Sequence, residues 1–308
     1  MTSFSAAAAD APSLFGFRVR CAEPLRFLRA GGGAETLEIA VREKPSVRPS
    51  TGLIGDWPLH GTSYPARASL YRVRDGYEYW TTDTGRYFVD LEHGRIEIPA
   101  LEDAILREQR LHGMPMVLSF THRGDFSLHA AAVEMDGGAV LLAAPSHHGK
   151  TTLAFACLKR GHRLLSEDLV CCRGDATAVL PGPALLRLRP DVYDGTLPEG
   201  LSVAAARPDR IFVSLGAARR GTSAPVPLRG IVFLRESSDL RVERVLAKDS
   251  LRDLWHLSFR EGTTEGRAES FRRLTHLAGV VPVWNLHRPI ELSSLEATVE
   301  VLHERVAR

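Results

Sequence analysis

Lysine is scarce in this chain of 308 residues. Of the 39 basic residues, only Lys44, Lys150, Lys159 and Lys248 are lysine, and the other 35 are arginine. In so arginine-rich a composition, a lysine seldom falls at a given position by chance. A lysine inside a recognisable motif therefore carries more weight here than in a protein of average composition.

Strong net charge and long apolar runs are also missing. The formal net charge is +2, with acidic and basic residues mixed along the chain, so no field that attracts nucleic acid or an anionic membrane surface is expected. The longest apolar stretch, Ala139 to Pro145, is far shorter than the roughly 20 residues that cross a bilayer. We therefore predict neither a nucleic-acid partner nor a membrane span.

Cysteines are few and lack the spacing of metal or redox motifs. There are four, of which Cys171 and Cys172 are adjacent, so in a strand their side chains point to opposite faces. We predict reduced, structural thiols. The first ten residues lack the positive charge and the apolar segment of a secretory leader. Residues 1–12 are therefore predicted to be the disordered N-terminus of a cytoplasmic protein.

The first third of the chain has the pattern of a β-rich region. Short alternating runs such as Phe17–Cys21 and Leu37–Val41 are separated by Gly and Pro, as expected of half-buried strands. The Pro- and Gly-rich stretch 45–65 predicts an irregular connection. We assign 13–112, with a helix near Leu101–Leu111 at its end, to an N-terminal β-rich region that is a candidate for substrate recognition.

Residues 113–308 form the second predicted region, which combines strands with helices. Leu128–Val133, a turn at Met135–Gly138 and Ala139–Ala143 predict a β-hairpin. The segment from Thr151 to Arg160 is apolar nearly all round and ends before Gly161, which is typical of a buried helix.

The chain ends in a predicted amphipathic helix. Apolar residues recur every three or four positions at Leu292, Leu295, Val299, Leu302 and Val306. Ser293 and Glu296 have the spacing of a capping box. The apolar face can pack in its own core or against a second copy of the chain, which leaves a homo-oligomer open.

The loop between the hairpin and the buried helix has the pattern of a phosphate-binding loop. Its sequence is Ala144-Pro145-Ser146-His147-His148-Gly149-Lys150-Thr151, which matches Gly-x-x-x-x-Gly-Lys-Ser/Thr except at Ala144. Because the loop joins a strand to a helix, backbone N–H groups and the helix N-terminus can converge on a phosphate. Lys150 then reaches the outer phosphates, and the Thr151 hydroxyl binds Mg²⁺. We predict ATP and Mg²⁺ at residues 144–152, including Thr152.

Other interpretations of the loop remain open at this point. Gly-Lys-Thr can stand at a helix start by chance, and Ala144 adds a Cβ at the first turn. His147 and His148 can be phosphate donors or exposed loop positions, and we predict no metal site from them.

Glu167 and Asp168 are the candidate acids. They lie 17 and 18 residues after Lys150, enough for one helix, a turn and a short strand returning beside the first. If the two strands are parallel, their carboxyl ends lie at the same sheet edge, where ligands of open α/β sheets bind. A carboxylate there can orient Mg²⁺ or accept a hydroxyl proton. An isolated acidic pair would instead be read as a solvated turn.

His129 ends the strand that is predicted to run antiparallel to the one entering the loop. A lone histidine in this position is usually structural. From this strand it can also approach the phosphates from the side.

These residues resemble the catalytic domain of HPr serine kinase/phosphorylase and its relatives. The relatives include HPr kinase-like kinases found beside biosynthetic genes for ribosomal peptides such as lasso peptides. The resemblance covers residues 128–172, and its spacings, 21 residues from His129 to Lys150 and 18 from Lys150 to Asp168, match the family's pattern.

The resemblance implies a P-loop domain akin to that of phosphoenolpyruvate carboxykinase, an α/β fold with α+β character built on a mixed β-sheet. It also implies active-site roles for His129, Lys150, Glu167 and Asp168. Asp168 would be the base that accepts the proton of a serine or threonine hydroxyl, and Thr151 and Asp168 would hold Mg²⁺. Glu167 stands where the family usually has aspartate.

The chain departs from the family in two places. The Glu-Ile-Arg-Gly motif that follows the acids is not recognisable, and residues 186–191 occupy roughly its place. The segment tied to phosphorylase activity is not evident either, so we expect a kinase without the reverse reaction. Arg187, Arg189 and Arg210 are candidates for neutralising the transferred charge, and the sequence does not choose between them.

Three functions fit these observations. The leading hypothesis is ATP-dependent phosphorylation of a serine or threonine hydroxyl in a peptide or protein, with a ribosomally made precursor peptide preferred on the resemblance. The second is a kinase for a small molecule such as an amino acid or sugar, which needs a closed pocket rather than an open groove. The third is a nucleotide-binding regulatory subunit without phosphoryl transfer, which Ala144 and the missing motif favour.

Overall fold

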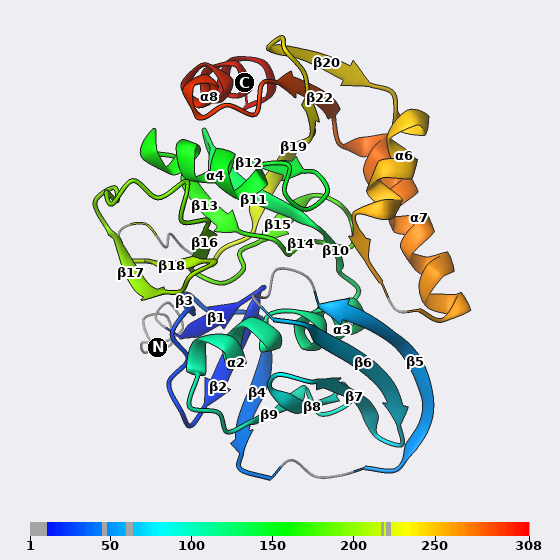
Figure 1. Ribbon diagram of the computed structural model, residues 1–308. Coiled ribbons are helices and arrows are strands. Elements are labelled where there is room, and N and C mark those ends of the chain that lie inside the picture. The colour runs from blue at the N-terminus through cyan, green and yellow to red at the C-terminus, as the bar shows by residue number, and fades with distance from the viewer. Residues whose placement is uncertain are drawn as a thin grey trace, which may run out of the picture.

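The computed structural model describes residues 11–44, 48–59, 64–216, 219, 223–260 and 262–307. Two large β-sheets dominate it, one in a β-rich N-terminal part and one in the part that carries the predicted phosphate-binding loop (Figure 1). The fold is thus mixed α/β. Most of the N-terminus that was predicted to be disordered, residues 1–10, lies outside the described residues, and Pro12 already belongs to a strand.

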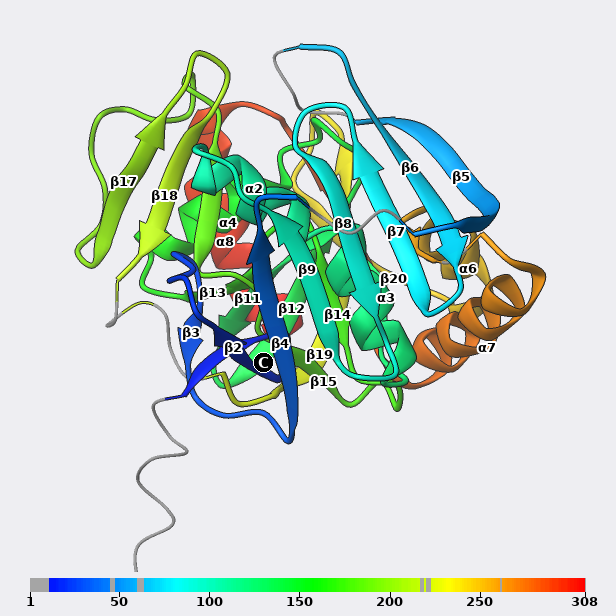
Figure 2. The ribbon, with the colours of Figure 1, turned by 90° about the horizontal axis from the view of Figure 1, so that it is seen from below.

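The N-terminal sheet has nine strands in the order β3-β1-β2-β4-β9-β8-β7-β6-β5. Figure 2 shows β4 to β9 side by side, with β5 at the edge. The pairs β2–β4 and β4–β9 are parallel, and the others are antiparallel. The strands are β1 Pro12–Leu14, β2 Phe17–Cys21, β3 Arg29–Ala30, β4 Glu35–Arg42, β5 Ser50–Leu59, β6 Ala66–Val73, β7 Gly76–Thr81, β8 Gly85–Asp90 and β9 Arg95–Pro99.

The prediction of an irregular connection at 45–65 is wrong for most of the residues that the structure describes there. Ser50–Leu59 forms the ten-residue edge strand β5, which pairs with β6 through two register shifts. Residues 45–47 and 60–63 lie outside the described part. An edge strand with bulges tolerates Gly and Pro, because only one side of its backbone has to pair.

Two short helices connect the sheets. α2 spans Ala104–Leu111, where Asp103 caps the helix by accepting the Leu106 N–H at 3.0 Å. α3 spans Met114–His122 and was not predicted. Buried side chains of α3, among them Met116 and Phe120, pack in the core of the N-terminal sheet. The domain boundary after residue 112 stays a prediction.

The second sheet has ten strands. Its order is β13-β11-β12-β19-β15-β14-β10-β21, and β22 pairs with both β19 and β20. The strands are β10 Phe126–Leu128, β11 Ala130–Met135, β12 Gly138–Ala143, β13 Arg163–Ser166, β14 Val170–Cys172, β15 Ala178–Leu180, β19 Val226–Glu236, β20 Arg241–Val245, β21 Ser258–Phe259 and β22 Val283–Arg288. Three further strands, β16 Leu185–Leu188, β17 Leu201–Ala206 and β18 Ile211–Leu215, form a small antiparallel sheet.

The predicted hairpin is confirmed by the pairing of β11 with β12. Asp136 and Gly137 at its turn have φ of 48° and 74°, as expected of the Asp-Gly turns that suit the twist of paired strands. All six residues of β12 are buried, with Val140 and Leu142 in one core and Leu141 in another. This explains why the strand entering the loop is a continuous apolar run.

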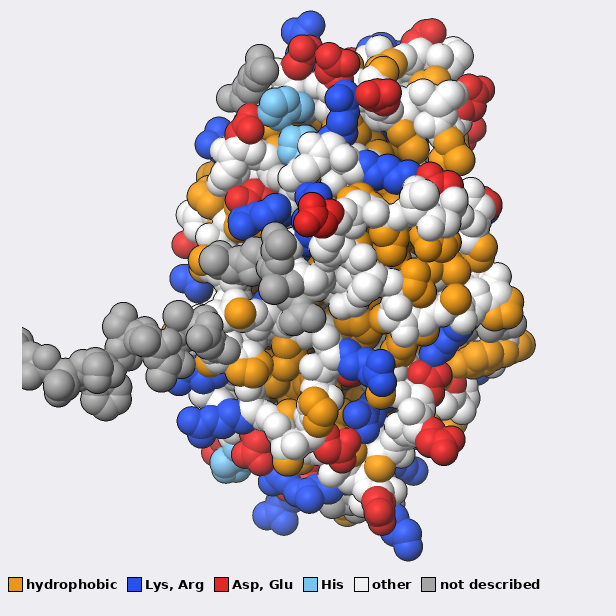
Figure 3. Space-filling model, turned by 90° about the vertical axis from the view of Figure 1, so that its left-hand side faces the viewer, with side chains coloured by type: hydrophobic (Ala, Val, Ile, Leu, Met, Phe, Trp, Pro, Cys, Tyr) orange, Lys and Arg blue, Asp and Glu red, His pale blue; other side chains and the backbone are white. Residues whose placement is uncertain are grey.

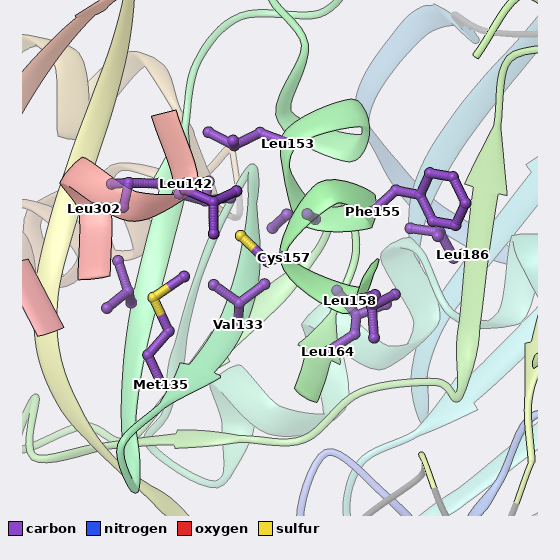
Figure 4. Close-up of a cluster of buried hydrophobic side chains, with 14 of the residues drawn as sticks. Val133, Met135, Leu142, Leu153, Phe155, Cys157, Leu158, Leu164, Leu186 and Leu302 are labelled. Carbon is purple, nitrogen blue, oxygen red and sulfur yellow. The ribbon is translucent and has the colours of Figure 1, made fainter. Parts of the chain in front are cut away.

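The predicted buried helix is α4, Lys150–Lys159. Figure 4 shows Leu153, Cys157 and Leu158 of α4 together with Val133 of β11 and Leu302 of the C-terminal helix α8 (Leu295–Leu302). Shortening a side chain in such a core costs about 2–5 kcal/mol. This core therefore holds α4, which directly follows the predicted phosphate-binding loop, against the sheet.

The return strand β13 does not lie beside β12, contrary to expectation. It pairs with β11 on the far side of the hairpin. Because β13 and β12 are both antiparallel to β11, they still run in the same direction. Their carboxyl ends therefore reach the same sheet edge, as the prediction required, and the direct parallel neighbour of β12 is β19.

The remaining helices are α6 Ala247–His256, α7 Thr264–Val280, the 3₁₀ turn η1 Leu292–Ser294, α8 Leu295–Leu302 and the π-helical turn η2 His303–Ala307. The capping box predicted for the C-terminal helix is wrong. Ser294, not Ser293, occupies the cap, and no side chain caps the helix. The apolar face of α8 packs within the chain's own core.

The cysteine prediction is confirmed. Cys171 and Cys172 point to opposite faces of β14, into two different cores, and all four thiols are free. Burial raises the pKa of Cys172 to about 12, so this thiol is unreactive at neutral pH. Within the described residues, no helix combines the length and the apolarity that crossing a membrane requires.

Candidate active site

The predicted phosphate-binding loop leaves β12 and turns into α4. His147 and Gly149 have φ of 68° and 77°, in the left-handed region where glycine is strongly favoured. At Gly149 a Cβ would also require the Arg288 side chain to shift, because an ideal Cβ would lie 2.4 Å from its Nη2. Ala144, the departure from the motif, is 2 % exposed and packs in the hydrophobic core. Its methyl group is therefore accommodated away from the loop.

Lys150 is folded back across the loop. Its ammonium group donates to the carbonyl oxygens of Ala144 at 2.8 Å and Pro145 at 3.0 Å. The side chain is buried, and this burial lowers the pKa of Lys150, although the charges of Glu167 and Asp168 act in the opposite direction. A cation held in so dry a place interacts more strongly with an anion than it would in water.

Glu167 connects the first turn of α4 with a strand of the small sheet. Its Oε1 accepts a hydrogen bond from the Thr151 hydroxyl at 2.7 Å, and its Oε2 accepts one from Nε of Arg187 at 2.8 Å. The Glu167 side chain is only 7 % exposed. A carboxylate with two such donors is well satisfied and fixed in place.

Asp168 is the more exposed of the two acids. Its Oδ1 shares a hydrogen bond of 2.9 Å with Nε2 of His129, and its Oδ2 forms an ion pair of 2.7 Å with Nη2 of Arg187. The side chain is 45 % exposed. Its backbone has φ of 72°, a conformation that is uncommon for non-glycine residues and recurs at functional sites.

The charge of Arg187 decides the protonation of Asp168. Desolvation alone would raise the pKa of Asp168, but Arg187 and the hydrogen bond from His129 outweigh it and hold the pKa below its ordinary value. The charges of Glu167 and Asp168 in turn outweigh burial and raise the pKa of Arg187. Asp168 is therefore ionised at neutral pH.

The structure separates the three arginines that the sequence could not rank. Arg187, on β16, bridges both acids and is 18 % exposed. Arg189 forms an exposed pair with Asp191, and Arg210 donates to the backbone oxygen of Asp209. Only Arg187 among the three touches the predicted catalytic residues.

His129 is not within a strand, contrary to prediction. It lies at the bend between β10 and β11, where its backbone N–H donates to the Leu257 oxygen at 2.6 Å. Its ring also lies 5.9 Å from the ring of Phe259. The ring is hydrogen-bonded to Asp168, and both residues line the same cleft as the loop.

The other loop residues have no partner among the acids. Nδ1 of His148 shares a hydrogen bond of 2.9 Å with the Ser146 oxygen, and Pro145, Ser146 and His147 are exposed. Thr152 is half-buried and lines the same cleft as Lys150 and Thr151. The role of residues 144–152 in binding a nucleotide stays a prediction.

Sequence reasoning missed two residues at this site. Arg288, at the end of β22, is 2 % exposed and donates through Nη2 to the His148 oxygen at 3.2 Å. His112, at the end of α2, is buried, and its Nε2 has no hydrogen-bond partner among the described residues. Burial and the charge of Arg187 lower the pKa of His112 to about 3, so it is neutral. Both come from distant segments, and no local motif identifies them.

A cleft of about 1030 Å³ joins this cluster to the N-terminal sheet. One wall carries the residues just described. The other wall is aromatic and aliphatic, with Ile54, Trp57, Leu70, Tyr79, Met114 and Val117. On the face drawn in Figure 3, hydrophobic side chains gather around the middle, between the upper and the lower part of the molecule.

The donor set at the cluster fits Mg²⁺ in the presence of a nucleotide. Thr151 offers a hydroxyl and Glu167 and Asp168 offer carboxylates, the oxygen ligands that this ion prefers. Among the described residues, no three His, Cys, Asp or Glu side chains converge as a metal site.

Comparison with known proteins gives a distant, partial similarity. Over 73 residues, 24 % of this chain, the sequence is 34 % identical to HPr kinase/phosphorylase of Xanthomonas campestris pv. campestris (strain B100) and, with the same identity, of Xylella fastidiosa (strain M12). The match spans 19 % of the length of these relatives. No family model matches the chain.

Among solved structures, the Hpr(Ser) kinase/phosphatase from Coxiella burnetii is similar with a TM-score of 0.29 and 14 % identity. The alignment covers 56 % of this chain and 93 % of that chain. A likeness at this score adds no argument about function.

Proposed function

We propose that the chain is an ATP-dependent kinase that phosphorylates a serine or threonine hydroxyl of a peptide or protein. The observation that carries this proposal is the continuous set of contacts from Thr151 through Glu167 and Arg187 to Asp168. It links a phosphate-binding helix start to a half-exposed carboxylate. A kinase for hydroxyl groups needs these two parts side by side.

The triphosphate would bind at residues 144–152. Its oxygens would take over the Lys150 ammonium from the Ala144 and Pro145 carbonyls, because a charge-assisted bond to phosphate is stronger than a bond to a neutral carbonyl. Thr151 and Glu167, whose side chains are joined by a hydrogen bond, would hold Mg²⁺, which would supply charge neutralisation on the phosphates. Asp168 as a further ligand for the ion, as predicted from the sequence, stays a proposal.

The acceptor would reach the γ-phosphoryl group on the Asp168 side. Its hydroxyl oxygen attacks phosphorus, the bond from phosphorus to the bridging oxygen breaks, and ADP leaves. The hydroxyl proton passes to a free lone pair of Asp168, since a carboxylate has about four such sites and two are in use. Because the pKa of Asp168 is lowered, the proton moves to it only after the bond to the leaving oxygen is largely broken, which fits a loose transition state. Asp168 then releases the proton to solvent.

The open cleft and its apolar wall favour a peptide or protein acceptor over a small metabolite. A sugar or free amino acid needs a closed pocket with several convergent polar groups, whereas the half-buried Ile54, Trp57 and Met114 offer contact area to apolar side chains. A ribosomally made precursor peptide is our preferred acceptor. The similarity to HPr kinase/phosphorylase supports the reaction type and not this choice.

The test is phosphoryl transfer by the full-length chain with Mg²⁺-ATP and peptides encoded near its gene, followed by mass spectrometry of the modified residue. We expect a mass gain of one phosphoryl group on a serine or threonine. Asp168→Asn should slow transfer by about 10³-fold while ATP still binds, because a positioned base contributes about 10²–10⁴-fold.

Asp194→Asn is the matched control, since Asp194 is an exposed carboxylate that pairs with Lys159 at the far end of α4. Transfer that is as fast in Asp168→Asn as in the control would refute the assigned role of Asp168. Tight ATP binding without transfer to any peptide would favour a regulatory subunit instead.

A further inference from the structure

The directions of three strands place a second loop beside the phosphate-binding loop. β12 is parallel to β19, and β19 is parallel to β22. The segments that leave β12 and β22 therefore emerge at the same edge of the sheet. The first is the loop 144–149, and the second is residues 289–292.

The acids approach from the opposite side. Glu167 and Asp168 follow β13, which lies beyond β11, while β19 and β22 lie on the other flank of β12. If the γ-phosphate of a bound nucleotide faces the acids, the base end must point away from them. That direction leads toward residues 289–292.

Direct contacts tie this segment to the loop. Arg288 donates through Nη2 to the His148 oxygen at 3.2 Å and through Nη1 to the Pro289 oxygen at 3.1 Å. The same Nη2 occupies the space where a side chain at Gly149 would lie. The segment 289–292 is thus fixed at the rim of the phosphate-binding loop.

Two large apolar side chains stand exposed on the segment. Ile290 is 44 % exposed and Leu292 is 54 % exposed, and both line the cleft that holds Lys150 and Asp168. Exposed apolar residues scattered singly need no explanation, but a pair of them beside a phosphate site suits a ligand with an apolar face. A nucleobase attached to the triphosphate is such a ligand.

We propose that Ile290 and Leu292 form the contact surface for the nucleobase of the bound nucleoside triphosphate. This inference rests on the proposed function, because it takes the loop 144–152 as the triphosphate site. The base packs over the two side chains, and the phosphates extend across Gly149 toward Glu167 and Asp168. The surface then contributes to the affinity for ATP and not to that for the phosphate chain alone.

The test compares two probes, ATP and inorganic tripolyphosphate, by calorimetric titration of the full-length chain with Mg²⁺. Ile290→Ser and Leu292→Ser should each raise the dissociation constant for ATP by about tenfold through lost apolar burial. The dissociation constant for tripolyphosphate should stay unchanged. Val280→Ser is the matched control, since Val280 is 55 % exposed at the end of α7 and does not line the cleft.

Several outcomes would overturn the inference. One is an equal loss of ATP and tripolyphosphate affinity in Ile290→Ser, and another is ATP binding in Leu292→Ser that matches the control, with melting temperatures showing that the variants are folded. Wild-type protein that binds ATP no tighter than tripolyphosphate would also contradict it. These results leave the proposed function standing. By contrast, ATP binding that survives Lys150→Met unchanged would refute the phosphate site and the proposed function with it.

Discussion

The two walls of the cleft are built from opposite kinds of side chains. The wall that carries the loop 144–152 has charged groups in mutual contact, such as Glu167, Arg187 and Asp168. The facing wall, from the N-terminal sheet and α3, presents aromatic and aliphatic groups, and Trp57 stacks on Tyr79 with ring centroids 6.3 Å apart. Charges stabilise a transferred phosphoryl group best when they are held in place and shielded from water. An apolar surface strengthens binding but takes no part in the chemical step.

This contrast suggests a division of work. Under the proposed function, changes on the charged wall alter the rate of transfer, and changes on the apolar wall alter only the affinity for the acceptor. Kinetic constants can separate the two effects, because losses confined to the transition state lower kcat while losses of uniform binding raise KM.

Replacement of Lys150 is expected to have the largest effect in this set. Lys150→Met removes the one lysine that lines the cleft among the described residues and should lower kcat/KM for ATP by about 10²–10³-fold, as for other fixed electrostatic groups. Steady-state kinetics with labelled ATP measure it. Lys159→Met, at the far end of the same helix and paired with Asp194, should behave like wild type. An equal fall of kcat/KM in both variants would show that the charged wall does not carry out phosphoryl transfer.

Replacement of Arg187 should change both the rate and its pH dependence. Arg187→Gln should lower kcat by about 10²-fold. It should also move the acid limb of the pH–rate profile to higher pH, because the charge of Arg187 holds the pKa of Asp168 down and an accepting carboxylate must be ionised. A profile whose acid limb stays in place would refute this link.

The pH dependence of unfolding should reflect the same shift in the pKa of Asp168. In the wild type, the depressed pKa of Asp168 contributes stability above its unfolded pKa of about 3.9, and this contribution is lost as the pH falls through the folded pKa. Without the charge of Arg187 that contribution shrinks. The melting temperature of Arg187→Gln should therefore fall further below that of the wild type at pH 7 than at pH 3. Arg189→Gln is the control, because Arg189 pairs with exposed Asp191.

The smallest effect is expected on the apolar wall. Trp57→Ala should raise KM for a peptide acceptor by about tenfold through lost apolar contact and leave KM for ATP and kcat unchanged. Leu53→Ser is the matched control, since Leu53 is 59 % exposed on the same strand β5 and does not line the cleft. A fall in kcat without a change in KM would contradict the division between the two walls.

Local patterns predicted the elements around the loop well. The hairpin of β11 and β12, the buried helix α4 and the opposite faces of Cys171 and Cys172 follow from periodicity and turn chemistry. Predictions failed where tertiary context overrode the local pattern. The stretch 45–65 contains Gly and Pro and yet supplies the edge strand β5, and β13 pairs across the hairpin rather than beside β12.

The candidate site was predictable only in part. The loop, Glu167 and Asp168 could be selected from the motif and its context, and His129 because its spacing from Lys150 resembles the family's pattern. Arg187 was one of three equal candidates until the structure placed it between the two acids. Arg288 and His112 had no local signal, because each reaches the site from a distant strand or helix.

The sequence by itself determined the strand, loop and helix that carry Lys150, since short-range apolar periodicity and the special conformation of Gly149 suffice for that motif. Only the tertiary structure decided which partners surround it. The bond from Thr151 to Glu167, the bridge through Arg187 and the apolar wall around Trp57 join segments far apart in the chain. Their proximity depends on how the sheets pack, because packing is a property of the whole chain and not of a local pattern.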